Sequence, residues 1–252
     1  MNRFSVGVIA LWLAGIFLAA CVSQGNLAEF QIATDATFTS FETVDMTTGQ
    51  FSGFDIDLMR AIASRAGFQV KFSNVAFITL IKSVASCQFD GGIAAIGITS
   101  PLQQQVHFSD PYLTVGQVVV VKKGNLTING RDQLPGMAVG TQRGSASALA
   151  IQNIPGIRLA PYDSFEQAFQ DLADGNIDAV VAGAPRAQSF VNIKANNLKI
   201  VGGEFADESY GIAICNQNGE LLKKINAGLK AVKDDGTLNN LLQKWNIKGR
   251  VE

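Results

Sequence analysis

Residues that commonly build metal centres and catalytic triads are scarce in this sequence. It has one histidine, His107, and three cysteines, none of which stand in a Cys-x-x-Cys pair. Zinc sites and Ser-His-Asp triads therefore have almost no material from which to form. We expect a protein without a metal ion, a cofactor or catalytic residues.

A surplus of charge of either sign is missing as well. Twenty basic and 21 acidic residues give the 252-residue chain a formal net charge of −1. Nucleic-acid binding needs a basic face, and no Lys/Arg-rich run forms a membrane-surface patch, so nucleic acid is excluded as a partner. Hydrophobic residues make up 47% of the chain, which is ample for a core. The length suits one large domain or two lobes.

The first apolar segment is short and has the features of a secretory signal. Arg3 precedes an apolar stretch over residues 6–20, whereas a transmembrane helix needs about 20 apolar residues. The tetrapeptide Leu-Ala-Ala-Cys at 18–21 resembles a bacterial lipobox, which implies a lipidated Cys21. The alternative is a plain signal peptide or anchor that happens to contain a cysteine. We expect residues 1–20 to be a removed signal peptide and Cys21 to anchor the chain to a membrane, in the periplasm or at the cell surface.

Two further cysteines, Cys87 and Cys215, remain in the mature chain. In an oxidising compartment they could form a disulfide. They could equally be two small buried residues, which is the interpretation that we favour.

From residue 30 onward, segments with the periodicity of strands alternate with amphipathic helices. The helices are expected over 54–67, 78–86, 145–152, 164–174, 220–233 and 237–245, and the strands over 30–34, 69–72, 91–96, 115–121, 137–140, 177–182, 198–201 and 210–214. Strands separated by helices predict parallel sheets with helices on both faces. Ligands bind such sheets at the carboxyl ends of the strands, which here are the loops at 35–41, 97–102, 141–147 and 183–186.

Six motifs follow one another in the order of a known family. They are TDATFTSFE with GFDIDL at 34–42 and 53–58, GITSP with FSDPY at 97–101 and 108–112, VGTQRG at 139–144, LADGNIDAVV at 172–181, YGIA at 210–213, and DGT with KW at 235–237 and 244–245. Together they resemble the polar amino-acid solute-binding proteins of bacterial ABC transporters, known as family 3. The resemblance covers essentially all of the mature chain.

This resemblance implies an α/β, two-lobed periplasmic-binding-protein fold of type II, with two crossover strands as a hinge. Lobe one would comprise residues 21–119 and 208–252, and lobe two residues 120–207. Such a protein captures a small polar, amino-acid-like molecule in the cleft between the lobes, closes around it and delivers it to an ABC permease in the cytoplasmic membrane. We expect it to act as a monomer.

The resemblance also implies which residues face the ligand. Phe38 occupies the position of a ring that stacks on the ligand, and Phe77 a position that is often aromatic; core packing is the alternative for both. Polar contacts are expected from Asp35, Thr99, Gln142 and Ser145. Residues 144–147 open a helix, where backbone N–H groups could hold an anionic group.

Three positions depart from the family pattern. Relatives that bind free amino acids usually hold the α-carboxylate with an arginine at the position of Leu102, and the α-ammonium with an aspartate at the position of Gly183. Gly97 stands where a serine or threonine is usual. Removing one partner of a buried charged contact costs about 2–5 kcal/mol, so we expect ordinary amino acids to bind weakly.

Two arginines beside the cleft loops, Arg143 and Arg186, could compensate for the missing charges. An exposed arginine near a helix start is the alternative for each.

Two other functions stay open. A sensory or scaffold protein would keep the two-lobed clamp without a transport ligand, as the missing charges allow. A cyclohexadienyl-dehydratase-like enzyme would need a carboxylate in the cleft as a general acid. We place no glutamate in any cleft loop and expect His107 on the surface, so we predict no enzymatic activity.

Overall fold

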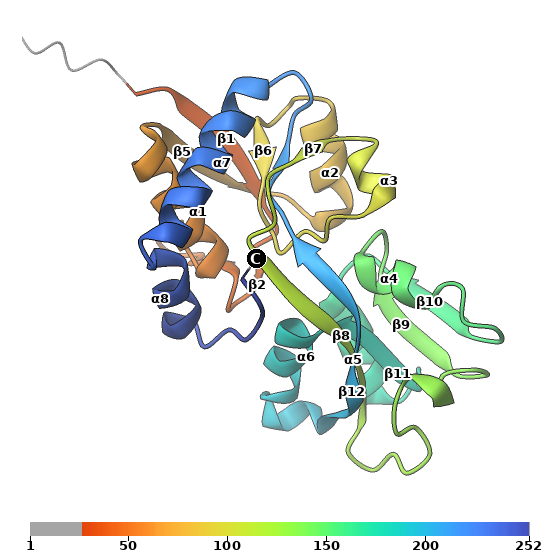
Figure 1. Cartoon of the computed structure of the whole chain (residues 1–252). Helices are drawn as coiled ribbons and strands as arrows, with labels where there is room; N and C mark the ends of the chain where they lie inside the picture. The colour runs from red at the N-terminus through yellow and green to blue at the C-terminus, as the bar shows by residue number, and fades with distance from the viewer. Residues whose placement is uncertain (1–26, 252) are drawn as a thin grey trace, which may run out of the picture.

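The computed structural model describes residues 27–251, which form two lobes, each built on a five-stranded sheet (Figure 1). The predicted signal peptide and Cys21 lie outside the described residues. None of the helices within 27–251 combines the length and the hydropathy that crossing a bilayer requires.

The first lobe is built on a sheet with the strand order β5-β1-β6-β13-β7. These strands are β5 Gln69–Asn74, β1 Glu29–Thr34, β6 Gly91–Gly92, β13 Ala213–Ile214 and β7 His107–Phe108. One face is covered by α1 Phe54–Ala66, α7 Gly219–Asp234 and α8 Thr237–Lys244, and the other by α2 Phe77–Ala85 and α3 Ser100–Gln103. A small antiparallel sheet precedes α1, made of β2 Thr37–Phe38, β3 Glu42–Val44 and β4 Phe51–Ser52.

The second lobe is built on a sheet with the order β10-β9-β11-β8-β12. Its strands are β10 Arg158–Tyr162, β9 Ala138–Gln142, β11 Ala179–Gly183, β8 Leu113–Lys122 and β12 Leu198–Tyr210. Its helices are α4 Ala146–Ile151, α5 Phe165–Asp174 and α6 Ala184–Val191, with 3₁₀ turns at Arg131–Gln133 and Lys194–Asn196. Buried clusters on the two faces of this sheet give the lobe a hydrophobic core of its own.

Two long strands, β8 and β12, connect the lobes (Figure 1). They pair in antiparallel fashion along most of their length, and their register shifts between Val201 and Phe205 and again between Phe205 and Asp207. Irregularities of this kind bend a strand pair locally. The chain therefore passes between the lobes along two adjacent strands, as the resemblance implied.

The sequence predicted six of the eight α-helices within residues 27–251, missing α3 and α6, and it predicted the sheets less well. Ser164 caps α5 through its Oγ, which accepts from the Gln167 N–H at 3.3 Å, and Gly175 ends this helix with a positive φ of 86°. The expectation of wholly parallel sheets is wrong, because β13 and β8 pair in antiparallel fashion with their neighbours. β8 crosses between the lobes, and β13 follows the crossover strand β12. The residue pattern of a strand does not show whether it runs parallel or antiparallel to its neighbours.

Two aspartates play equivalent parts in the two sheets. Asp90 precedes β6 and accepts from the Gln31 N–H at 2.8 Å, and Asp178 precedes β11 and accepts from the Ala138 N–H at 2.7 Å. Each carboxylate thus binds a backbone N–H of the neighbouring strand.

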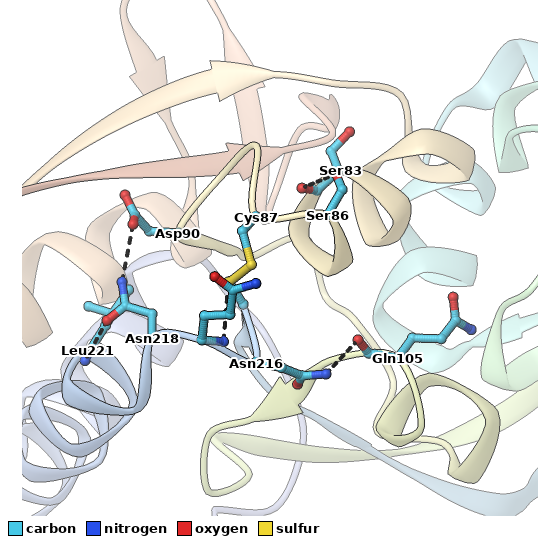
Figure 2. Close-up of a disulfide and its surroundings, with 10 residues drawn as sticks. Ser83, Ser86, Cys87, Asp90, Gln105, Asn216, Asn218 and Leu221 are labelled. Carbon is cyan, nitrogen blue, oxygen red and sulfur yellow. Dashed lines mark hydrogen bonds between the residues drawn. A yellow bond between two sulfur atoms is a disulfide. The ribbon is translucent and has the colours of Figure 1, made fainter.

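Cys87 and Cys215 form a disulfide, so the favoured interpretation of two unpaired buried thiols is wrong (Figure 2). Their Cα atoms lie 5.2 Å apart, although 128 residues separate them in the sequence. Cys87 lies in the turn between α2 and β6, and Cys215 directly follows β13. Because β13 pairs with β6, the two cysteines are brought together. The Asn218 side chain donates to Asp90 Oδ1 at 3.1 Å in the same region. The bond therefore ties the returning C-terminal segment to the first part of the lobe.

Candidate functional site

A small, partly open cavity of about 20 Å³ lies where the two lobes meet. Both lobes line it, together with the end of β12: Phe77, Ala95, Gly97 and Leu102 come from the first lobe, Gln142, Gly144, Ser145, Ala146, Ser147, Phe165, Gly183 and Arg186 from the second, and Glu208 and Tyr210 from β12. Three of the four predicted cleft loops contribute to this lining. The volume suits about one water molecule, so a ligand of amino-acid size requires the lobes to separate.

Arg186 reaches from the second lobe into the first. It begins α6, at a Gly-Ala-Pro-Arg sequence whose proline suits the first turn of a helix. Its guanidinium carbon lies 3.9 Å from the centroid of the Phe38 ring and 5.0 Å from that of Phe165. Such contacts contribute up to about 2 kcal/mol when they are desolvated. Arg186 is 8% exposed, so the alternative of a surface arginine is wrong.

Two buried carboxyl groups lie behind Arg186 in the first lobe. Glu42 Oε1 is 3.9 Å from the Arg186 guanidinium, and burial together with the neighbouring Asp55 raises the pKa of Glu42 well above its usual range. Burial raises the pKa of Asp55 to about 7, although its carboxylate accepts from the Ala95 N–H at 2.7 Å and the Tyr112 hydroxyl at 3.1 Å. Near neutral pH the pair therefore holds at least one proton.

Glu208 is a cavity residue that the sequence reasoning missed. It is 8% exposed, and the Gln117 side-chain amide donates to its Oε2. Burial raises the pKa of Glu208 to about 7, and the Gln117 hydrogen bond and the Arg186 charge oppose this rise. The prediction that no cleft loop contains a glutamate did not extend to Glu208, because Glu208 lies on the crossover strand β12. Its position two residues before the YGIA motif is the signal that could have found it.

The remaining expected ligand residues divide into two groups. Phe77, Gln142 and Ser145 line the cavity. The Ser145 hydroxyl accepts from the Ala148 N–H at 3.2 Å and donates to the Gln142 carbonyl at 2.7 Å, so it caps α4. The Gln142 amide donates to the Asp163 carbonyl at 3.2 Å.

The second group lies near the cavity without lining it. Asp35 accepts from the Phe77 N–H at 3.1 Å, and burial raises its pKa. Phe38 stacks on Phe41 at 4.5 Å as well as on Arg186. The buried Thr99 hydroxyl has no hydrogen-bond partner within residues 27–251.

Arg143 differs from Arg186 in both exposure and partners. Its side chain is half exposed, its Nε is 3.4 Å from Asp163 Oδ1, and its Nη2 donates to the Pro161 carbonyl at 3.3 Å. The guanidinium is therefore directed to the surface of the second lobe in this conformation.

Leu102, at the position of the usual arginine, lies on α3, shares a buried cluster with α2 and presents an apolar surface to the cavity. Within the described part of the chain, no three His, Cys, Asp or Glu side chains are grouped to hold a metal ion.

The fold and the interlobe cavity define a two-lobed ligand-binding protein, and sequence comparison gives its family. Residues 30–248 match the family described as bacterial extracellular solute-binding proteins, family 3, and the chain belongs to this family. It is 34% identical to a putative ABC transporter arginine-binding protein 2 of Escherichia coli K12, over 94% of this chain and 97% of the relative.

Solved structures agree with this assignment. An ancestral arginine-binding protein bound to arginine is 40% identical, with a TM-score of 0.80 over 86% of this chain and 98% of the other. An ancestral amino acid-binding protein, a precursor of cyclohexadienyl dehydratase, is 32% identical, with a TM-score of 0.77 over 86% and 95% of the two chains. The two-lobed fold predicted from the motifs is confirmed.

Proposed function

We propose that the chain is the extracytoplasmic solute-binding component of an ABC uptake system, which captures a small amino-acid-like molecule between its lobes. The observation that carries this proposal is the cavity itself, which both lobes and a crossover strand line together. Ligand binding at such a place is coupled to hinge closure, because contacts to both lobes form only in the closed state. An ABC permease in the cytoplasmic membrane would receive the closed, loaded protein.

The proposed division of the chain follows from the crossover strands. Residues 21–119 and 208–252 form lobe one and residues 120–207 form lobe two. The separate hydrophobic clusters of the two sheets support this division, except that Val118 and Val119 pack in the clusters of the second lobe. The hinge then lies in β8 and in the irregular part of β12.

The proposed ligand contacts are the side chains that would face a ligand after the lobes have opened, admitted it and closed around it. Arg186 and Phe38 supply a charged and an aromatic group, and their burial beside the cavity supports this role. The other members of the set are Asp35, Phe77, Thr99, Gln142, Arg143 and Ser145. Arg143 would have to leave Asp163 to take part.

The location of the mature protein is also a proposal. A signal peptide over residues 1–20 and a lipid on Cys21 would hold it at the membrane, in the periplasm or at the cell surface, as a monomer. The relatives' transport roles and the lipobox-like tetrapeptide support this arrangement.

One observation favours a second candidate, a cyclohexadienyl-dehydratase-like enzyme. Glu208 is a buried acid with a pKa of about 7, which suits a general acid at neutral pH. A dehydratase precursor is also among the structural relatives, although that protein is described as amino acid-binding. Formation of product from prephenate or arogenate would favour this candidate.

The experiment for the main proposal is calorimetry against a panel of amino acids, amines and other small polar metabolites. Saturable binding without turnover supports capture and transport. Absence of binding across the panel, with a folded protein, would favour the sensory or scaffold alternative.

A further inference from the structure

Two glycines that depart from the family pattern lie against the same side chain. A Cβ atom built on Gly183 would lie 3.2 Å from Glu208 Oε2, and one built on Gly97 would lie 2.5 Å from Glu208 Oε1. The second distance is shorter than real Cβ atoms allow, so a serine or threonine at 97 would displace the carboxylate. The absence of side chains at both positions thus makes room for Glu208.

The backbone around Glu208 fixes its place in the cleft. Gly97 bridges to Tyr210, and the Ile98 N–H donates to the Ser209 carbonyl at 2.8 Å, so the 97–98 segment lies beside the end of β12. Gly183 ends β11, where it pairs with Gln117 of β8. Glu208, itself on the crossover strand β12, therefore stands between the loops of both lobes.

One carboxylate oxygen of Glu208 is held and the other is left for a partner. Gln117 donates to Oε2, which orients the group. Oε1 accepts no hydrogen bond from any residue in the described range 27–251, and Glu208 lines the cavity. A carboxylate that is this deeply buried gains most from a charged donor.

The charges around the cavity favour a positive ligand group. Four buried acids, Asp35, Glu42, Asp55 and Glu208, lie in this region, and burial raises the pKa of each. Arg186 acts on all four and is the one buried arginine or lysine in the described part of the chain. A cation in the cleft would stabilise the ionised form of Glu208.

We propose that Glu208 receives the protonated amine of the ligand, at the place that the family pattern gives to a side chain at position 183. This inference rests on the proposed capture function and specifies its ligand as a small molecule with a protonated amine. It also replaces the expectation that the ligand's amine has no carboxylate partner in this protein. In relatives the carboxylate belongs to an aspartate at the end of β11, whereas here the Glu208 carboxylate would reach the cleft from β12. Gln117 is a positioning residue, because it acts through the Glu208 carboxylate.

The test compares free and blocked amines on the same ligands. The probes are L-arginine and L-glutamine, each paired with its Nα-acetyl derivative, titrated by calorimetry into the wild type and Glu208→Gln. For the probes that bind the wild type, the variant should lose at least about 30-fold in affinity for the free amine. The acetylated probes should bind weakly to both proteins.

A matched control and a relocation variant separate a ligand role from a structural one. Glu220→Gln removes an exposed glutamate from α7, which does not line the cavity, and should leave the affinities unchanged. In a Tyr210→Phe background, Glu208→Ser with Gly183→Asp moves the carboxylate and should recover part of the affinity that Glu208→Ser alone loses. Tyr210 is changed because a Cβ at 183 would lie 2.7 Å from its hydroxyl.

The outcomes distinguish this inference from the proposed function. If the wild type binds the probes but Glu208→Gln binds them equally well, or if acetylation has no effect, the role of Glu208 is refuted and capture stands. If no free amine binds the folded wild type while another metabolite of the panel does, the amine assignment is refuted and capture again stands. If nothing binds, both fail.

Discussion

Removing the Arg186 guanidinium should destabilise the protein much more at pH 8 than at pH 5. At pH 8 the carboxyl groups of Asp55 and Glu208, each with a pKa of about 7, are largely ionised and depend on this one buried cation. At pH 5 both carry protons, so Arg186 loses most of its electrostatic partners. The aromatic contacts with Phe38 and Phe165 remain at both pH values.

The expected magnitudes follow from these contacts. Breaking a buried ion pair costs about 3–5 kcal/mol, whereas a desolvated cation–π contact contributes about 2 kcal/mol, part of which a methionine retains through its own packing. We therefore expect Arg186→Met to lower the free energy of unfolding by about 3 kcal/mol at pH 8 and about 1 kcal/mol at pH 5.

Urea denaturation followed by circular dichroism measures both values. Arg143→Met is the matched control, because it removes an exposed arginine whose partner Asp163 is also exposed. It should cost less than about 1 kcal/mol at either pH. Equal destabilisation by Arg186→Met at pH 5 and pH 8 would refute the argument that Arg186 stabilises ionised buried acids.

Three further predictions follow from the same structure. Raising the pH from 5 to 8 should lower the unfolding free energy of the wild type, because burial raises the pKa of Asp55 and Glu208 from the ordinary 3.8 and 4.5 to about 7. The folded state then retains protons that the unfolded chain has lost, which amounts to about 2–3 kcal/mol for each group over this pH range, and a urea midpoint that is constant or rises would contradict this. Changing both Cys87 and Cys215 to serine should cost about 5 kcal/mol, since the bond closes a loop of 128 residues; an unchanged midpoint under non-reducing conditions would show that the bond does not form in solution. Cys21→Ser should release the protein from the membrane fraction or leave it unprocessed, and mass spectrometry that finds no lipid on wild-type Cys21 would disprove the anchor.

Local sequence signals predicted the helices because the signals act within a few residues. Ser164 and Gly175 mark the ends of α5 by a side-chain cap and a positive φ, and both are visible as residue types. Strand direction was mispredicted because β8 and β12 take their partners from chain segments far away. α6 was missed because 183–186 was interpreted as a cleft loop, although Pro185 in its first turn is a helix-start signal.

The site was predictable where it lies on loops and unpredictable where it depends on the crossover. Gln142 ends β9, Ser145 and Arg186 follow β9 and β11, and all three line the cavity. Glu208 lies on β12, and only the pairing of β12 with β8 brings it beside Gly97 and Gly183. The disulfide was missed for the same reason, since β13 returns to β6 after more than 100 residues.

The central claim is that the two lobes close around a small ligand by bending at β8 and β12. Small-angle X-ray scattering of the wild type, with and without the tightest-binding member of the amine panel, tests it most directly. The account predicts a smaller radius of gyration at saturation, because a ligand that contacts both lobes favours the closed state over the open one. An identical radius of gyration in the two states, with binding verified by calorimetry on the same sample, would contradict it.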